Sequence, residues 1–184
     1  MKKLLIILLL FTGCNYKELN NIAIVTGIYI EYNNQYKIDI MMSKNKNIIY
    51  HTKGKTINKA LDNLTIPKQL YLGHLNIVII NKNANKKMQE ITNYFNNNYE
   101  VSKNFYIMMS NNNILKIIAK LDPFPFNKIS LIKISDNHLT YDKYIKNNLE
   151  KGYSYIPIVE YKDNYLTTKK SILIRGIKWK SGIK

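Results

Sequence analysis

The chain opens with one unbroken apolar run, which follows a basic pair and stops just before the only cysteine of the sequence. Lys2 and Lys3 precede the apolar residues 4–11, and Thr12 and Gly13 separate this run from Cys14. A membrane-spanning helix needs about 20 apolar residues, so the run is too short to span and is typical of the h-region of a signal peptide. A single cysteine cannot form a disulfide within the chain. The rest of the chain must therefore fold around a hydrophobic core without disulfide bonds.

The charge is strongly positive, with 28 Lys and Arg residues against 12 Asp and Glu residues and a formal net charge of +16. Only one of the basic residues, Arg175, is an arginine, and Lys, Asn, Ile and Tyr together make up 98 of the 184 residues. Those four residue types have A/T-rich codons, so codon bias accounts for much of the lysine. Dedicated nucleic-acid recognition favours arginine, whose planar guanidinium pairs with phosphate and guanine. We therefore expect no nucleic-acid partner.

Short segments rich in β-branched and aromatic residues alternate with segments of helical periodicity. Residues 22–30 and 36–42, joined by an Asn-rich turn, predict a β-hairpin. Further strands are expected at residues 76–80, 105–109, 155–161 and 171–179, and helices at 57–64 after an N-cap at Thr56, 86–95, 114–121 and 140–150. Residues 123–126 contain two prolines and are irregular, and residues 129–134 are either a strand or an inward-packing loop. The pattern predicts an α+β domain with a mixed or mainly antiparallel sheet covered by helices.

Residues that could perform chemistry are scattered. His51 and His138 are isolated among polar residues, and His74 is expected to donate a buried hydrogen bond that fixes the turn begun by Gly73. No histidine has a second His, Cys or carboxylate at the spacing of metal ligands, and no phosphate-binding loop or nucleophile motif is present in the sequence. We therefore predict no catalytic residue, no metal, no cofactor and no enzymatic activity.

The N-terminal segment resembles the lipobox of bacterial lipoproteins, in which a cysteine follows a small residue at the end of a basic and then apolar leader. The resemblance implies cleavage after Gly13, so that residues 1–13 are a lipoprotein signal peptide and Cys14 carries a diacylglyceryl group that anchors the protein to a membrane. Phe11 departs from the usual Leu, Val or Ile. The alternative is that Cys14 is a buried cysteine in an apolar N-terminal helix.

Four ordered segments after Cys14 resemble the Ger(x)C family of spore germination lipoproteins. They are Glu18-Leu19-Asn20 with the strand that follows, Gly54-Lys55-Thr56-Ile57, residues 70–80 with Tyr71, Gly73, His74 and Leu75, and residues 93–95 with 104–107. Asn15-Tyr16 stands where the family usually has Trp-Asp. The resemblance implies a germination-protein N-terminal α+β domain over residues 14–170, followed at 171–184 by the start of a further strand or a truncated second domain.

The same resemblance implies a function and its partners. Members of this family are non-enzymatic, lipid-anchored C subunits of nutrient germinant receptors, held at the outer face of the spore inner membrane together with the integral-membrane A and B subunits. We therefore expect this chain to act in germination by assembly with those subunits. The alternatives are a substrate-binding lipoprotein of a transporter, another surface-tethered binding lipoprotein, and a tethered enzyme, against which the absence of a catalytic motif argues.

Overall fold

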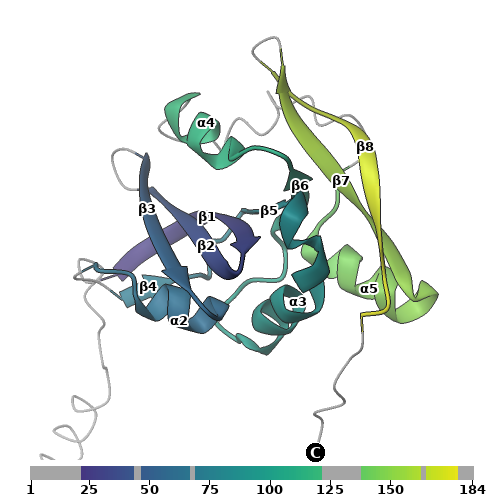
Figure 1. The fold of residues 1–184 in the computed structure, drawn as a ribbon, viewed down its shortest axis with the longest axis horizontal. Coiled ribbons are helices and arrows are strands. Elements are labelled where there is room, and N and C mark those ends of the chain that lie inside the picture. The colour runs from purple at the N-terminus through teal and green to yellow at the C-terminus, as the bar shows by residue number, and fades with distance from the viewer. Residues whose placement is uncertain (1–21, 44–46, 67–68, 122–137, 163–164, 178–184) are drawn as a thin grey trace, which may run out of the picture.

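A computed structural model of the chain describes residues 22–43, 47–66, 69–121, 138–162 and 165–177 (Figure 1). These residues form one eight-stranded sheet with helices on both faces. The proline-containing segment at 123–126 and residues 129–134 lie outside the described residues.

The first three strands form an antiparallel meander at one edge of the sheet. They are β1 (Ile22–Asn33), β2 (Gln35–Ser43) and β3 (Asn47–Gly54). The turn between β1 and β2 places Asn34 at φ 59°, a left-handed conformation that asparagine tolerates better than most residues. The hairpin predicted from the sequence is therefore confirmed, whereas β3 was missed.

The helix α2 (Ile57–Asp62) follows β3 after a sharp turn. Thr56 caps it as predicted, because its side chain accepts a hydrogen bond of 3.2 Å from the backbone N–H of Lys59. A Cβ atom on Gly54 would lie 2.7 Å from Cα of Ala60, and the hydroxyl of Thr52 donates to the carbonyl of Ala60. The Gly-x-Thr-Ile sequence therefore allows the helix to pack directly on the end of β3.

The centre of the sheet is parallel. Its remaining strands are β4 (Gln69–Tyr71), β5 (Ile77–Asn81), β6 (Tyr106–Ser110), β7 (Tyr153–Lys162) and β8 (Tyr165–Arg175). The strand order is β3-β2-β1-β5-β6-β7-β8, with β4 paired to the start of β1. The pairs β1–β5, β5–β6 and β6–β7 are parallel, and β7–β8 is an antiparallel hairpin. The expected α+β class with a mixed sheet is confirmed.

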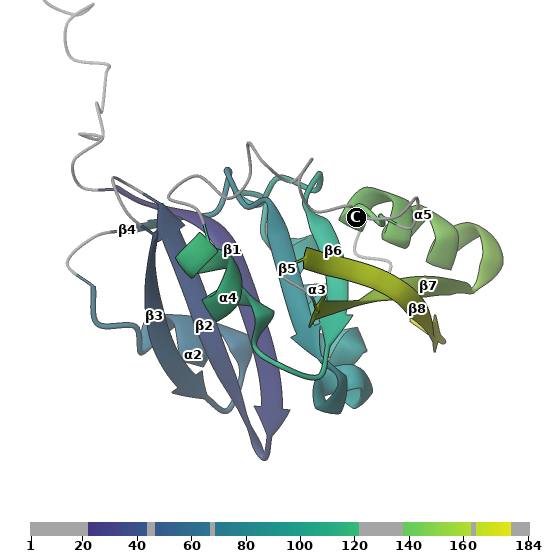
Figure 2. The same cartoon turned by 90° about the horizontal axis from the view of Figure 1, so that it is seen from above.

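Helices cover the two faces of the sheet unequally. The helices α2, α3 (Met88–Asn97, after the 3₁₀ turn η2 at Lys82–Lys87) and α5 (Tyr141–Lys151) lie along one face, and α4 (Ile114–Leu121) lies on the other (Figure 1). Seen from above, α4 lies over β1 and β2 (Figure 2). The helices expected at 86–95, 114–121 and 140–150 are thus confirmed within a few residues.

A hydrophobic cluster fills the space on each face. The larger cluster includes an aromatic group that joins α3, β6 and α5, in which the rings of Phe105 and Tyr141 stack with 4.7 Å between their centroids and Phe95 lies 5.2 Å from Phe105. The smaller cluster, under α4, packs Leu115 against Met41 and other residues of the sheet. All five of these side chains are fully buried, so burial of apolar surface on both faces holds the helices to the sheet.

The C-terminal strand differs in extent from the one expected. It was predicted at residues 171–179, but β8 spans Tyr165–Arg175 and pairs along its length with β7. Residue 171 therefore lies in the middle of a strand of this sheet. The short β4 was not predicted, because three residues do not produce a detectable alternation.

Candidate functional site

The residue predicted to carry the lipid, Cys14, lies outside the described residues, as do Glu18, Leu19 and Asn20. The described chain begins at Ile22, where β1 pairs with Gln69 of β4. In the described part of the chain no helix is both long and apolar enough to cross a bilayer. The anchor itself therefore stays a prediction.

The turn that contains His74 differs from its expected role. His74 is exposed, and its ring lies 5.6 Å from that of Tyr71 in an edge-on contact, so the buried hydrogen bond expected for it is wrong. The neighbours Leu72 and Leu75 are buried instead, and the backbone N–H of Leu75 donates to the carbonyl of Leu72. Gly73 does lie in a tight turn, where a Cβ atom would collide with the Tyr71 ring. The turn is therefore stabilised by the two buried leucines and by the absence of a side chain at Gly73, and not by a hydrogen bond from the imidazole.

The histidine with a carboxylate partner is His51, which the sequence presented as isolated. Asp39 of β2 lies opposite His51 of β3, and Nδ1 of His51 is 2.6 Å from Oδ1 of Asp39. The side-chain amide of Asn113 donates to Oδ2 of Asp39, and Nζ of Lys116 lies 3.7 Å from the same oxygen. The side chain of Asp39 is 12% exposed, and these contacts compensate the charge of its carboxylate.

This Asp39 cluster is suited to joining elements. It connects β2 and β3 to the start of α4, and the partners of Asp39 are the imidazole of His51, the amide of Asn113 and the ammonium of Lys116, not a hydroxyl or thiol that a His–Asp pair would activate. Among the described residues no group of three His, Cys, Asp or Glu side chains is placed to hold a metal ion. The pairing was missed because β3 was missed, and only the register of β2 with β3 brings the two residues together.

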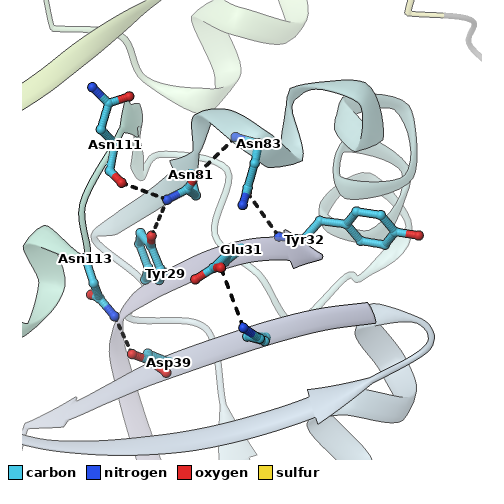
Figure 3. A network of polar contacts seen from close by, with 9 residues as sticks. Tyr29, Glu31, Tyr32, Asp39, Asn81, Asn83, Asn111 and Asn113 are labelled. Carbon is cyan, nitrogen blue, oxygen red and sulfur yellow. Dashed lines mark hydrogen bonds and ion pairs between the residues drawn. The ribbon is translucent and has the colours of Figure 1, made fainter. Parts of the chain in front are cut away.

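A second polar network lies where β1, β5 and β6 end (Figure 3). The side-chain N–H₂ of Asn81 donates to the hydroxyl of Tyr29 at 2.6 Å and to the carbonyl of Asn111 at 3.0 Å, while its oxygen accepts from the N–H of Asn83 at 3.0 Å. Asn83 in turn accepts from the N–H of Tyr32. Burial raises the pKa of Tyr29, so this hydroxyl stays neutral. Asn81 uses both ends of its amide to hold the strand ends together.

A groove of about 660 Å³ runs between α2 and α3. Its lining is polar and aromatic: Tyr36, Thr56, Ile57, Asn58, Glu90, Asn93, Tyr94, Asn97, Asn98, Tyr99 and Glu100. These residues include two carboxylates and no basic side chain, although the chain as a whole has a formal charge of +16. The lining therefore contributes acidic but no basic side chains, and Lys87 beside it pairs with one of the two carboxylates, Glu90.

One carboxylate of the groove is held from two sides. The hydroxyl of Tyr36 donates to Oε2 of Glu90 at 2.6 Å, and Nζ of Lys87 lies 2.5 Å from Oε1. Burial alone would raise the pKa of Glu90, but the hydrogen bonds from Lys87 and Tyr36 outweigh it and lower the pKa below its ordinary value. Burial raises the pKa of Tyr36 far above that of a free tyrosine. Glu90 is thus an ionised acceptor at neutral pH and Tyr36 a neutral donor.

The fold defines an α+β domain. The polar side chains of the Asp39 cluster and of the Asn81 network bind other residues of this chain. The groove between α2 and α3 is open to solvent. Residues 15–160 of the chain match the family model described as the spore germination protein N-terminal domain. The chain therefore belongs to this family of spore germination proteins, and the resemblance to Ger(x)C is confirmed. Searches of curated proteins and of solved structures found no match.

Proposed function

We propose that the protein is a lipid-anchored, non-enzymatic subunit of a nutrient germinant receptor that acts by assembling with integral-membrane subunits. The observation that carries this proposal is where the family match lies: it begins at Asn15, directly after the cysteine that ends the basic and apolar leader. A germination domain would thus start at the residue next to the acylated one. The proposed location is the outer face of the spore inner membrane.

The physical chemistry of the anchor supports stable attachment. Two acyl chains hold a protein on a bilayer where one chain gives only marginal binding. Cleavage after Gly13 removes Lys2 and Lys3 and leaves 26 basic against 12 acidic residues, a formal charge of about +14 that adds attraction to anionic lipid, about 1 kcal/mol for each Lys or Arg near the surface. The charge would assist the anchor, while Cys14 would specify it.

The anchor is tested by Cys14→Ala, with Asn15→Ala as a matched control that keeps the thiol. We expect Cys14→Ala to leave the membrane fraction and to slow nutrient germination, and Asn15→Ala to behave as the wild type. A Cys14→Ala protein that still fractionates with membranes, in spores that germinate normally, would rule out the anchor.

Assembly is tested separately by affinity purification of the full chain from detergent-solubilised spore membranes. We expect two integral-membrane subunits to be recovered with it. Recovery of the lipoprotein alone, from membranes that contain both subunits, would contradict the receptor assignment.

The groove between α2 and α3 favours a second candidate, a surface-tethered lipoprotein that binds a small polar solute. Its amide, hydroxyl and carboxylate lining offers many hydrogen-bonding groups in about 660 Å³. A ligand that binds the native state raises the melting temperature. A rise with one amino acid or sugar from a panel, lost on Tyr94→Ala and retained on Tyr153→Ala, would favour this candidate over the receptor subunit.

A further inference from the structure

The β7–β8 hairpin has two faces of different character at the end formed by residues 153–157 and 171–175. Ser154, Ile156 and Ile174 on the inner face are buried, and the side chain of Asn147 in α5 donates to the hydroxyl of Ser154 at 3.4 Å. Alternate residues point the other way. Tyr155 pairs with Leu173 and Tyr153 with Arg175 in the cross-strand register. We call these four residues the hairpin face.

The hairpin face lies open in the described structure. Tyr153 is 38% and Tyr155 56% exposed, and their rings contact each other with 5.8 Å between centroids. On this side of the sheet the cluster under α4 reaches the other end of the hairpin, at Val159, Tyr161 and Leu166, and α5 packs on the opposite face (Figure 2). Two exposed tyrosines in mutual contact on a sheet face form an apolar surface that a partner can bury.

The composition of the hairpin face points to a protein partner. Tyrosine and arginine are enriched at the energetic centres of protein interfaces, whereas lysine is depleted there. Arg175 is the single arginine among 28 basic residues of this chain, and it stands directly across from Tyr153. Lysine supplies positive charge everywhere else, so attraction to anionic lipid alone gives no reason for an arginine here. A planar guanidinium beside an aromatic ring suits paired hydrogen bonds to a carboxylate.

The charge of the molecule argues against a second copy as the partner. Two chains that have lost Lys2 and Lys3 with the leader each carry 26 basic against 12 acidic residues, a formal charge of about +14, and repel each other, and Arg175 is the charged residue of the hairpin face. The complementary surface is acidic, with apolar side chains beside the carboxylate. In Figure 1 the described chain begins with β1, on the opposite side of the molecule from β8.

We propose that the hairpin face, formed by Tyr153, Tyr155, Leu173 and Arg175, is the docking surface for an acidic and apolar protein surface of an integral-membrane subunit. This inference rests on the proposed function, since it assigns the contact face of the assembly. In the complex Tyr155 would be buried at the centre and Arg175 would pair with a carboxylate of the partner.

The first test is photo-crosslinking in intact spore membranes with a benzophenone amino acid in place of Tyr155. Tyr99, which is 92% exposed in the groove beside α3, is the control position. We expect an adduct with a membrane subunit from position 155 and none from position 99. An adduct from position 99 alone, an adduct with lipid alone, or a crosslink within the chain itself would each overturn the inference.

The second test is charge reversal. We expect Arg175→Glu to lower the recovery of membrane subunits at least fivefold and Arg175→Lys to lower it less, while Lys59→Glu on the exposed surface of α2 leaves it unchanged. Thermal unfolding of each purified variant tests whether the fold is retained. Equal recovery with Arg175→Glu and wild type would overturn the inference alone, whereas a wild-type chain that recovers no membrane subunit would overturn the proposed function and the inference with it.

Discussion

The hydroxyl of Tyr36 donates a hydrogen bond of 2.6 Å to Oε2 of Glu90 and so connects the start of β2 to the first turn of α3. The ring of Tyr36 is fully buried, while half of the Glu90 side chain is exposed. A core residue and a surface residue thus share one hydrogen bond at the wall of the groove. This contact fixes where α3 lies against the sheet.

Replacing Tyr36 by Phe removes that hydrogen bond and leaves the ring in the core. We expect the free energy of unfolding to fall by about 1–3 kcal/mol, because the acceptor is ionised. Urea unfolding followed by circular dichroism measures the change. Tyr99→Phe, at an exposed position, is the control and should alter stability by less than about 0.5 kcal/mol. Equal stabilities of Tyr36→Phe and wild type would show that the hydrogen bond contributes nothing.

The same carboxylate predicts a dependence of stability on pH. Burial opposes ionisation of Glu90, but the hydrogen bonds from Lys87 and Tyr36 keep its folded-state pKa below 4.5, the ordinary value. The unfolded state therefore binds the proton more readily, so the stabilisation is present above pH 4.5 and is lost as the pH falls through the folded-state pKa. Because half of the side chain is exposed, screening keeps the effect below about 1 kcal/mol.

The measurement compares urea midpoints of the wild type and Glu90→Gln between pH 7 and pH 2.5. The wild type should be more stable at pH 7, and the difference should shrink below pH 4.5. A difference that stays constant over this range would assign the effect of the substitution to shape and not to charge.

Gly54 is expected to be intolerant of any side chain. A Cβ atom there would lie 2.7 Å from Cα of Ala60, which is backbone and cannot swing aside. We expect Gly54→Ala to lower the free energy of unfolding by about 3 kcal/mol, at the upper end of the usual cost of overpacking. Gly152→Ala is the comparison, because Gly152 has φ 74° and open space around it, so it should cost only about 1 kcal/mol through backbone strain. If the two variants were equally stable, the close approach of α2 would not constrain position 54.

The Asp39 cluster predicts a larger loss of stability when the carboxylate is removed than when the imidazole is removed. Asp39→Ala should destabilise by about 1–3 kcal/mol, because it leaves the Asn113 amide without its buried acceptor. His51→Ala should cost less than about 1 kcal/mol, since 58% of the His51 side chain is exposed. Chemical denaturation of Asp39→Ala, of Asn113→Ala and of the double variant Asp39→Ala/Asn113→Ala gives the coupling energy between these two side chains. Additive effects would show that Asn113 does not depend on Asp39.

The sequence pattern predicted those elements whose residues alternate or repeat clearly. The β1–β2 hairpin was predictable because apolar residues flank an Asn-rich turn, and α2 because Thr56 precedes apolar residues at helical spacing. The edge strand β3 was missed because His51 and Lys53 interrupt its apolar character. An edge strand faces solvent on one side and needs little hydrophobic patterning.

The candidate sites were less predictable, because they depend on register and packing. Asp39 and His51 meet only through the pairing of β2 with β3, and Tyr36 meets Glu90 across 54 residues of sequence. The buried hydrogen bond predicted for His74 is wrong because the turn directs Leu72 and Leu75 inward and the imidazole outward. These long-range placements arise from the tertiary fold and leave no local pattern in the sequence.

The seam between β6 and β7 is narrow, since Met109 and Ile158 form its one registered residue pair. The hairpin β7–β8 is paired along its whole length, and β1 is paired to β2 and to β5 over several residues each. Local opening follows the weakest connection, so the β7–β8 hairpin separates before the rest of the sheet unfolds, while the stacked rings of Tyr141 and Phe105 hold α5 to the start of β6. Amide hydrogens in β7 and β8 therefore exchange through a smaller opening free energy than those of β1 and β5.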